Sequence, residues 1–202
     1  MPPDDGFARV FPDGRLVFQG QVLRCVLGKG GVVPAAAKRE GDGGTPAARM
    51  PLRRLFFRAD RGPAPRCAVP VEPIAPLDGW CDDPAHRAYN RPVQLPFDAS
   101  HEVLWRDDHV YDVIGVLGWN DDPVERGRGS AIFLHLARED GRPTEGCVAL
   151  APRDLRAVLA AGLLGVEVVG LGGAALRSMP CVAGAAFAAL PADRARRRAA
   201  RS

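Results

Sequence analysis

The chain has 202 residues, which is enough for one well-packed domain and short for two. Its 47% hydrophobic and 25% charged residues are an ordinary globular composition, and a formal net charge of +3 is too small to favour nucleic acid as a partner. No apolar run reaches the roughly 18 residues of a membrane-spanning helix. The 19 prolines and 23 glycines favour a loop-rich, mainly β domain over a helical bundle.

Short strands separated by glycine- and proline-rich loops are expected in the first half of the chain. Residues 16–27 alternate in polarity like a strand, and residues 53–58 fit a second, shorter strand. Residues 28–46 form a glycine-rich loop without the order of a phosphate-binding loop. Prolines between 63 and 76 make that stretch extended and non-helical, and a polar loop follows over residues 80–92.

The second half contains the clearest strands. Residues 101–105 fit a turn or short helix, residues 110–119 the clearest strand, and residues 130–136 the next one. One short helix is predicted after them, with Pro152 at its first position, an apolar i, i+3, i+4 pattern from Leu155, and Gly162 as its stop. Residues 166–171 complete the β set.

Three segments are expected: an N-terminal extension over residues 1–15, a single domain over residues 16–180, and a basic tail over residues 181–202. The tail has five arginines, which fit either a solvated flexible segment or a segment that binds an anionic polymer or lipid. The first ten residues lack the basic and apolar regions of a secretory signal.

The most informative stretch lies between residues 129 and 150. An apolar, strand-like run ends at His135, a polar loop follows, and Gly146-Cys147 then leads into another apolar run. A thiolate is a nucleophile that an adjacent imidazole can generate by taking the thiol proton. A glycine immediately before the cysteine allows a tight turn, in which backbone amides can face a developing oxyanion. The pattern therefore predicts a cysteine nucleophile with a histidine base.

This stretch resembles the catalytic motif of the L,D-transpeptidases, the enzymes that cross-link bacterial peptidoglycan. That motif is a histidine on a strand, a loop, then Ser/Thr-x-Gly-Cys and an apolar residue, which Thr144, Gly146, Cys147 and Val148 match after His135. Two further stretches agree: residues 38–46, which end in Gly-Gly-Thr-Pro, and residues 112–120, a strand that ends in Asn120. Many members have an arginine two residues after the cysteine, where this chain has Ala149, so the resemblance indicates a divergent subgroup.

The resemblance implies a β-sandwich of mixed sheets with one or more short helices. It implies acyl transfer from a peptidoglycan stem peptide through a Cys147 thioester, with His135 as general base and the Gly146 and Cys147 amides as oxyanion donors. In the family, a backbone carbonyl commonly orients the histidine, so no third catalytic side chain is needed. The resemblance also implies the cell envelope or periplasm as location, and a carbapenem as covalent inhibitor.

Two alternatives stay open. The same Cys/His site serves an L,D-carboxypeptidase or amidase if water is the acceptor, and a non-catalytic wall-binding module would keep the fold without the chemistry. The candidate substrate-binding residues are Thr144, Ser130, Asn120, Trp80 and Tyr89.

No metal or organic cofactor is expected. Cys81, Asp82, Asp83 and His86 are residue types that bind zinc, but their spacing matches no common structural site. Of the five cysteines, those at positions 25, 67 and 181 have apolar neighbours, which favours small buried side chains over reactive thiols.

Overall fold

The computed structural model describes residues 5–170, and this part of the chain is mainly β, as predicted. The single α-helix in it is α1 (Pro152–Ala160), and a short 3-10 helix covers Ala35–Ala37. The strands are β1 (Phe7–Val10), β2 (Arg15–Phe18), β3 (Gln21–Val26), β4 (Val32–Pro34), β5 (Thr45–Ala47), β6 (Arg49–Phe57), β7 (Val71–Pro73), β8 (Asp78–Cys81), β9 (Pro92–Gln94), β10 (His101–Val103), β11 (Val113–Leu117), β12 (Phe133–Leu136), β13 (Val148–Leu150) and β14 (Gly165–Val168).

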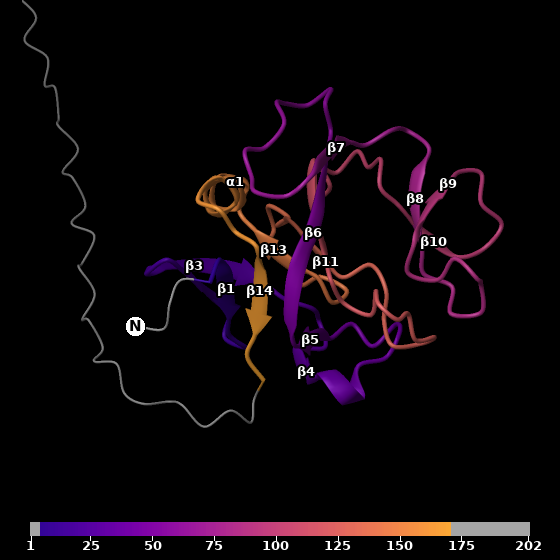
Figure 1. Ribbon diagram of the computed structural model, residues 1–202, viewed down its shortest axis with the longest axis horizontal. Coiled ribbons are helices and arrows are strands. Elements are labelled where there is room, and N and C mark those ends of the chain that lie inside the picture. Colours follow the sequence, from indigo (N-terminus) through magenta and orange to yellow (C-terminus); the bar gives the residue numbers. More distant parts are fainter. Residues whose placement is uncertain (1–4, 171–202) are drawn as a thin grey trace, which may run out of the picture.

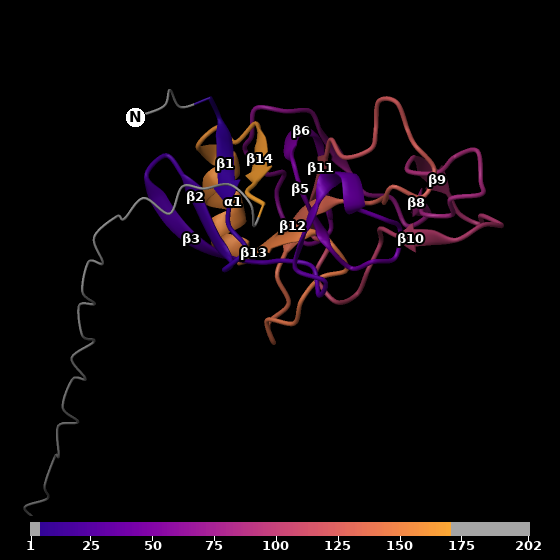
Figure 2. The ribbon, with the colours of Figure 1, turned by 90° about the horizontal axis from the view of Figure 1, so that it is seen from below.

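The main sheet has nine strands in the order β11-β12-β13-β3-β2-β1-β14-β6-β7, and it closes on itself because β6 also pairs with β11. The first residues of β6 pair with β14, and the rest pair with β11. The sheet is mixed: β12 and β13 are parallel, as are β1 and β14, whereas most other neighbours are antiparallel. A separate sheet with the order β10-β8-β9 lies at the opposite side of the molecule from β1, β2 and β3 (Figures 1 and 2).

Strands β11 and β12 are buried on both faces, which explains why they are the clearest strands in the sequence. One face contributes Val113, Leu134 and Leu136 to the main core inside the closed sheet. The other face contributes Ile114 and Phe133 to a second cluster, which includes Trp80 of β8. The catalytic candidates belong to this second face.

The predicted helix is confirmed as α1. Pro152 lies in its first turn, and its apolar stripe (Leu155, Val158 and Leu159) is buried in the main core. Gly162, with φ +93°, follows the helix in the left-handed conformation that glycine adopts readily.

Several other expectations need correction. Residues 16–27 are a hairpin of β2 and β3, whose turn residues Gln19 and Gly20 both have positive φ. Residues 101–103 form the strand β10 in place of a turn or helix, because they pair with β8. The strand β8 also includes residues 80 and 81, which were expected to begin a polar loop. The expected loop over residues 28–46 contains β4 and the start of β5.

The sheet begins before residue 16. Phe7–Val10 forms β1, which lies between β2 and β14 and carries the fully buried Ala8 and Val10. Residues 1–4, the end of the expected domain at residues 171–180 and the basic tail at 181–202 lie outside the described residues.

Candidate active site

Two adjacent parallel strands place His135 and Cys147 on one face of the sheet. His135 on β12 is in register with Ala149 on β13, and Cys147 precedes Ala149 by two residues. Because side chains two residues apart on a strand point the same way, Cys147 and His135 share the face that belongs to the second cluster.

A sharp turn precedes the cysteine. Gly146 has φ +134°, and a Cβ atom at this position would lie 2.9 Å from the carbonyl oxygen of Gly44. The expected role of this glycine in a tight turn thus has a steric reason. The Thr144 hydroxyl closes the turn by donating to the Cys147 carbonyl over 2.8 Å, while the Gly146 amide donates to that hydroxyl over 3.2 Å.

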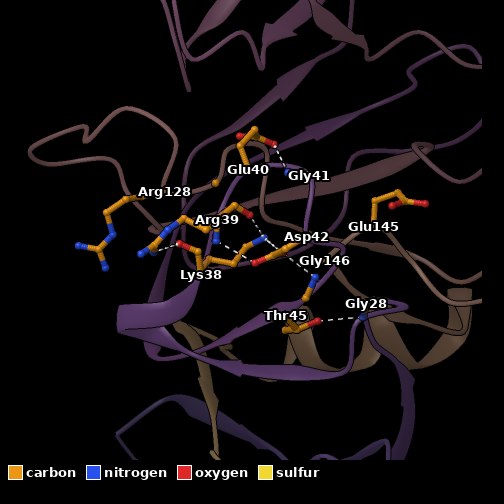
Figure 3. Close-up of polar contacts among 12 residues, drawn as sticks. Gly28, Lys38, Arg39, Glu40, Gly41, Asp42, Thr45, Arg128, Glu145 and Gly146 are labelled. Carbon is orange, nitrogen blue, oxygen red and sulfur yellow. Dashed lines mark hydrogen bonds and ion pairs between the residues drawn. The ribbon is translucent and has the colours of Figure 1, made fainter.

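The Gly-Gly-Thr-Pro stretch packs against this turn. Thr45 Oγ1 accepts a hydrogen bond from the Gly28 amide over 2.9 Å and contacts the Cys147 carbonyl over 3.4 Å. Figure 3 shows Thr45, Gly28 and Gly146 side by side, with the Lys38–Asp42 ion pair next to them. The two sequence elements of the resemblance, far apart in the chain, therefore meet at Cys147.

The Cys147 side chain is buried. Its Sγ donates to the carbonyl of Ala131 over 3.2 Å and accepts from the amide of Phe133 over 3.3 Å. Burial raises the pKa of the thiol to about 12, and the charge of Glu102 adds to this effect. The Cys147 side chain is therefore a protonated thiol in this structure.

His135 is held in the tautomer that a base requires. Its Nδ1 lies 2.9 Å from the carbonyl oxygen of Leu136, which only accepts hydrogen bonds, so Nδ1 carries the proton and Nε2 has a free lone pair. The ring packs edge-on against Tyr111 at 5.3 Å. Burial lowers the pKa of His135 to about 4, which keeps the imidazole neutral at physiological pH.

Cys147 and His135 line one cavity of about 600 Å³. Thr144, Ser130 and Ala149 line it as well, together with charged residues of both signs: Glu40, Asp82, Glu102, Glu145, Arg106, Arg138 and Arg142. A larger cavity of about 690 Å³ contains neither catalytic candidate and shares only Arg138 with the first. The smaller cavity is the candidate active site because it holds the candidate nucleophile and the candidate base together.

A set of hydrogen-bonded side chains, here called the supporting layer, holds residues 129–131, which include the Ala131 carbonyl that contacts the sulfur. The layer comprises Glu40, Trp80, Tyr89 and Asn90. Asn90 is buried, and its Oδ1 accepts from the Ala131 amide (3.1 Å) and from Trp80 Nε1 (3.0 Å). Ala131 itself has φ +51°, an unfavourable conformation for alanine, and its carbonyl accepts the Cys147 thiol.

Glu40 supports the same segment. It accepts hydrogen bonds from Ser130 Oγ (2.7 Å) and from the Tyr89 hydroxyl (2.5 Å), and the Gly129 amide donates to that hydroxyl. Neither Glu40 nor Asn90 was predicted from the sequence. For Asn90 the only sequence signal is a weak one, namely the aromatic residues Trp80 and Tyr89 in an otherwise polar stretch.

The predicted substrate-binding residues divide into two groups. Ser130 and Thr144 line the cavity, whereas Trp80, Tyr89 and Asn120 are not among its lining residues. Asn120 is hydrogen-bonded within the loop over residues 120–129. The direct substrate contacts of these last three residues stay predictions, and their observed contacts place them in the supporting layer.

Within residues 5–170, no group of three or more His, Cys, Asp or Glu side chains is arranged to hold a metal ion. In the Cys81 to His86 stretch, Cys81 Sγ lies 3.9 Å from His86 Nδ1. Cys25, Cys67, Cys81 and Cys147 are free thiols, and Cys181 lies outside the described residues.

A comparison with protein families agrees with this geometry. The family model YkuD, described as the L,D-transpeptidase catalytic domain, matches residues 3–169. Searches of curated proteins and of solved structures gave no match. Because the family model covers most of the chain, including every element of the site, the chain belongs to the L,D-transpeptidase catalytic domain family.

Proposed function

We propose that the protein is an L,D-transpeptidase that transfers an acyl group from a peptidoglycan stem peptide through a thioester on Cys147. The observation that carries the proposal is the shared cavity: a buried thiol and a neutral imidazole with a free Nε2 lie on the same face of two adjacent strands. A binding module has no need of this pair. Membership of a family that acts on peptidoglycan supports the substrate class.

The reaction begins with proton transfer from the Cys147 thiol to His135 Nε2. The sulfur then attacks the carbonyl carbon of the peptide bond between an L-centre and a D-centre, and His135 returns the proton to the leaving amine. An acceptor amine attacks the thioester and restores the thiol. In the resting geometry the thiol donates to the Ala131 carbonyl, so it turns from that oxygen toward His135 when the substrate binds.

The oxyanion of the tetrahedral intermediate would be stabilised by the backbone amides of Gly146 and Cys147. The Gly146 amide donates to Thr144 Oγ1 in the resting state, and a stronger acceptor such as an oxyanion competes for it. No metal or organic cofactor takes part in this mechanism.

The acceptor is an amine in this proposal, and water is the alternative acceptor. Ala149 stands where many relatives have an arginine, and it is buried opposite His135 in the cavity wall. Arg106, Arg138 and Arg142 line the same cavity and supply positive charge that would orient the substrate carboxylates. An acceptor amine that is bound in the cavity reacts with the thioester faster than water does, because it is held close to the thioester carbonyl.

The proposed site of action is the cell envelope, where peptidoglycan lies. No helix among the described residues is long and apolar enough to cross a membrane.

The nucleophile is tested by intact mass after incubation with a carbapenem, which should add one drug molecule to the protein. The Cys147→Ser variant should show no stable adduct, while the matched control Cys67→Ser should behave like the parent, because Cys67 does not line the cavity. An adduct that persists in Cys147→Ser would overturn the assignment.

Transfer and hydrolysis are separated by supplying a tetrapeptide stem as donor with a D-amino acid as acceptor. Mass spectrometry should detect the exchanged tetrapeptide. If only the tripeptide forms, even at high acceptor concentration, the protein is an L,D-carboxypeptidase with the same site.

A further inference from the structure

Lys38 is a charged side chain in a buried position, two residues before Glu40, which lines the candidate active site. The Lys38 side chain is only 3% exposed to solvent. Its ammonium group forms an ion pair with Asp42 and donates to the Arg39 carbonyl over 3.0 Å. Taking a lysine charge out of water is costly, and pairing it with a carboxylate often adds little net stability. The pair is therefore a candidate for a role in the site beyond stability.

Asp42 connects the Lys38 ammonium group to the backbone of the Gly-Gly-Thr-Pro stretch. Its Oδ1 accepts from that ammonium group and, over 2.8 Å, from the Gly44 amide. Its Oδ2 accepts from the Arg39 amide over 2.8 Å. Figure 3 shows the Lys38 side chain extended toward Asp42. The ion pair therefore helps to fix the position of residues 42–44, here called the glycine segment.

The glycine segment packs directly on the turn at Gly146. A Cβ atom on Gly146 would lie 2.9 Å from the Gly44 carbonyl oxygen. A Cβ atom on Gly28 would overlap the Gly43 carbonyl oxygen and lie 2.8 Å from Gly146 Cα. Because these backbones touch without side chains between them, a shift of the glycine segment has to shift Gly146, whose amide is a proposed oxyanion donor.

The aliphatic part of Lys38 contacts a second segment that adjoins the sulfur. Gly129 has φ +94°, and a Cβ atom on it would lie 3.0 Å from Lys38 Cε. Two residues later, the Ala131 carbonyl accepts the Cys147 thiol. Lys38 thus links the glycine segment with residues 129–131, and both of these contact the backbone or the side chain of residues 146–147.

We propose that Lys38 is a positioning residue for the reaction at Cys147, and that its ion pair with Asp42 holds the glycine segment against Gly146 in the geometry that stabilises the oxyanion. The proposal deepens the proposed function and rests on it, because acylation is the step that needs this oxyanion site.

The charge of Lys38 gives the proposal a second observable. Burial raises the pKa of Cys147 most and the charge of Glu102 adds to it, whereas the positive charge of Lys38 lowers it. Breaking the ion pair from either side should therefore disturb the glycine segment in the same way but change the charge near the thiol in opposite ways.

The first test measures acylation by a carbapenem with intact mass. Lys38→Met keeps the aliphatic contact with Gly129 and removes the ammonium group, whereas Asp42→Asn removes the carboxylate charge and still accepts the Gly44 amide. Both variants should lower the limiting acylation rate about tenfold without changing the half-saturating drug concentration, because the oxyanion forms only in the transition state. The control is Arg54→Met, which breaks the exposed Arg54–Glu72 ion pair and should acylate like the parent.

The second test measures how fast iodoacetamide, a neutral reagent, alkylates Cys147, with peptide mapping to separate it from the other cysteines. This reaction needs the thiolate and no oxyanion site. Lys38→Met should be alkylated about tenfold more slowly than the parent, which corresponds to a rise of one pKa unit, whereas Asp42→Asn should not be slower. A merely structural role would slow both variants alike.

The double variant Lys38→Met/Asp42→Asn keeps the test informative if Lys38→Met does not fold by circular dichroism, because it leaves no unpaired carboxylate. It should be alkylated about tenfold more slowly than Asp42→Asn alone, since the two proteins differ only in the ammonium group.

The outcomes separate the two proposals. Parental acylation in folded Lys38→Met or Asp42→Asn, or equal slowing of alkylation in both, would overturn the positioning role and leave the transpeptidase intact. If neither a carbapenem nor a stem donor acylates the parent protein, the proposed function fails, while the alkylation rates still decide whether Lys38 acts on Cys147.

Discussion

At the scale of single residues, Gly146 carries the strongest steric requirement of the site. Its φ is +134°, and a Cβ atom at this position would lie 2.9 Å from the Gly44 carbonyl oxygen, which leaves no room for a side chain. We expect Gly146→Ala to lower the free energy of unfolding by about 3 kcal/mol and to slow acylation of Cys147, because the turn has to open. Urea unfolding and intact mass after carbapenem treatment measure the two effects.

The matched control is Gly141→Ala in the preceding loop. Gly141 also has a positive φ (+68°), but nothing lies within 4 Å of its Cβ position. Gly141→Ala should lower the free energy of unfolding by about 1 kcal/mol, through backbone strain alone, and should leave the acylation rate of Cys147 unchanged. Equal effects for the two variants would show that the contact with Gly44 does not matter.

His135 makes a prediction about pH. Its pKa of about 4 lies below the ordinary value of 6.5, so the folded state binds fewer protons than the unfolded state between these two values. The free energy of unfolding is therefore highest above about pH 6.5 and falls as the pH drops toward 4. The total loss is about 3 kcal/mol at most. His135→Gln should flatten this part of the pH dependence, as measured by urea unfolding near pH 7 and near pH 4.5.

The same variant, His135→Gln, also tests whether His135 acts as the general base. Without a general base, the acylation rate should fall on the order of 10²–10⁴-fold while the protein stays folded by circular dichroism. Acylation at the parental rate would make His135 a structural residue.

At the scale of elements, the segment from Gly129 to Ile132 depends on the layer behind it. Asn90→Ala leaves the Ala131 amide and Trp80 Nε1 without their acceptor. We expect a loss of about 3 kcal/mol in unfolding free energy and slower acylation, because the Ala131 carbonyl no longer positions the thiol. The control is Gln94→Ala, whose exposed hydrogen bond to Asp78 should contribute little. Parental acylation in a folded Asn90→Ala protein would refute the positioning role.

At the scale of the whole molecule, β1 is an interior strand of the main sheet, between β2 and β14. It is parallel to β14 and antiparallel to β2, so its removal takes one of two neighbours from each of these strands and deletes the buried Ala8 and Val10. A protein that lacks residues 1–10 should lose cooperative thermal unfolding, because this loss is comparable with the whole stability of a domain.

A milder variant keeps the test informative if the truncated protein cannot be isolated. Val10→Ala should lower the unfolding free energy by about 2 kcal/mol, since the side chain is fully buried. A truncated protein with parental stability would show that the domain begins near residue 16.

Local patterns in the sequence were sufficient for the elements whose chemistry is local. The apolar runs of β11 and β12, the helix after Pro152 and the Gly-Cys turn each depend on neighbouring residues, and all are present. His135 and Cys147 were identified because a strand-borne histidine and a glycine-cysteine pair lie close together in the chain. Their catalytic roles stay predictions until the variants are measured.

Long-range pairing decided the rest. The strand β10 depends on β8 and the strand β1 on β14, and a short segment without a strong period becomes a strand only when a neighbour supplies its hydrogen bonds. Asn90, Glu40 and Glu102 come from loops and strands remote from Cys147, so the sequence alone does not indicate their place in the site. Burial, which only the tertiary structure determines, keeps the thiol and the imidazole neutral.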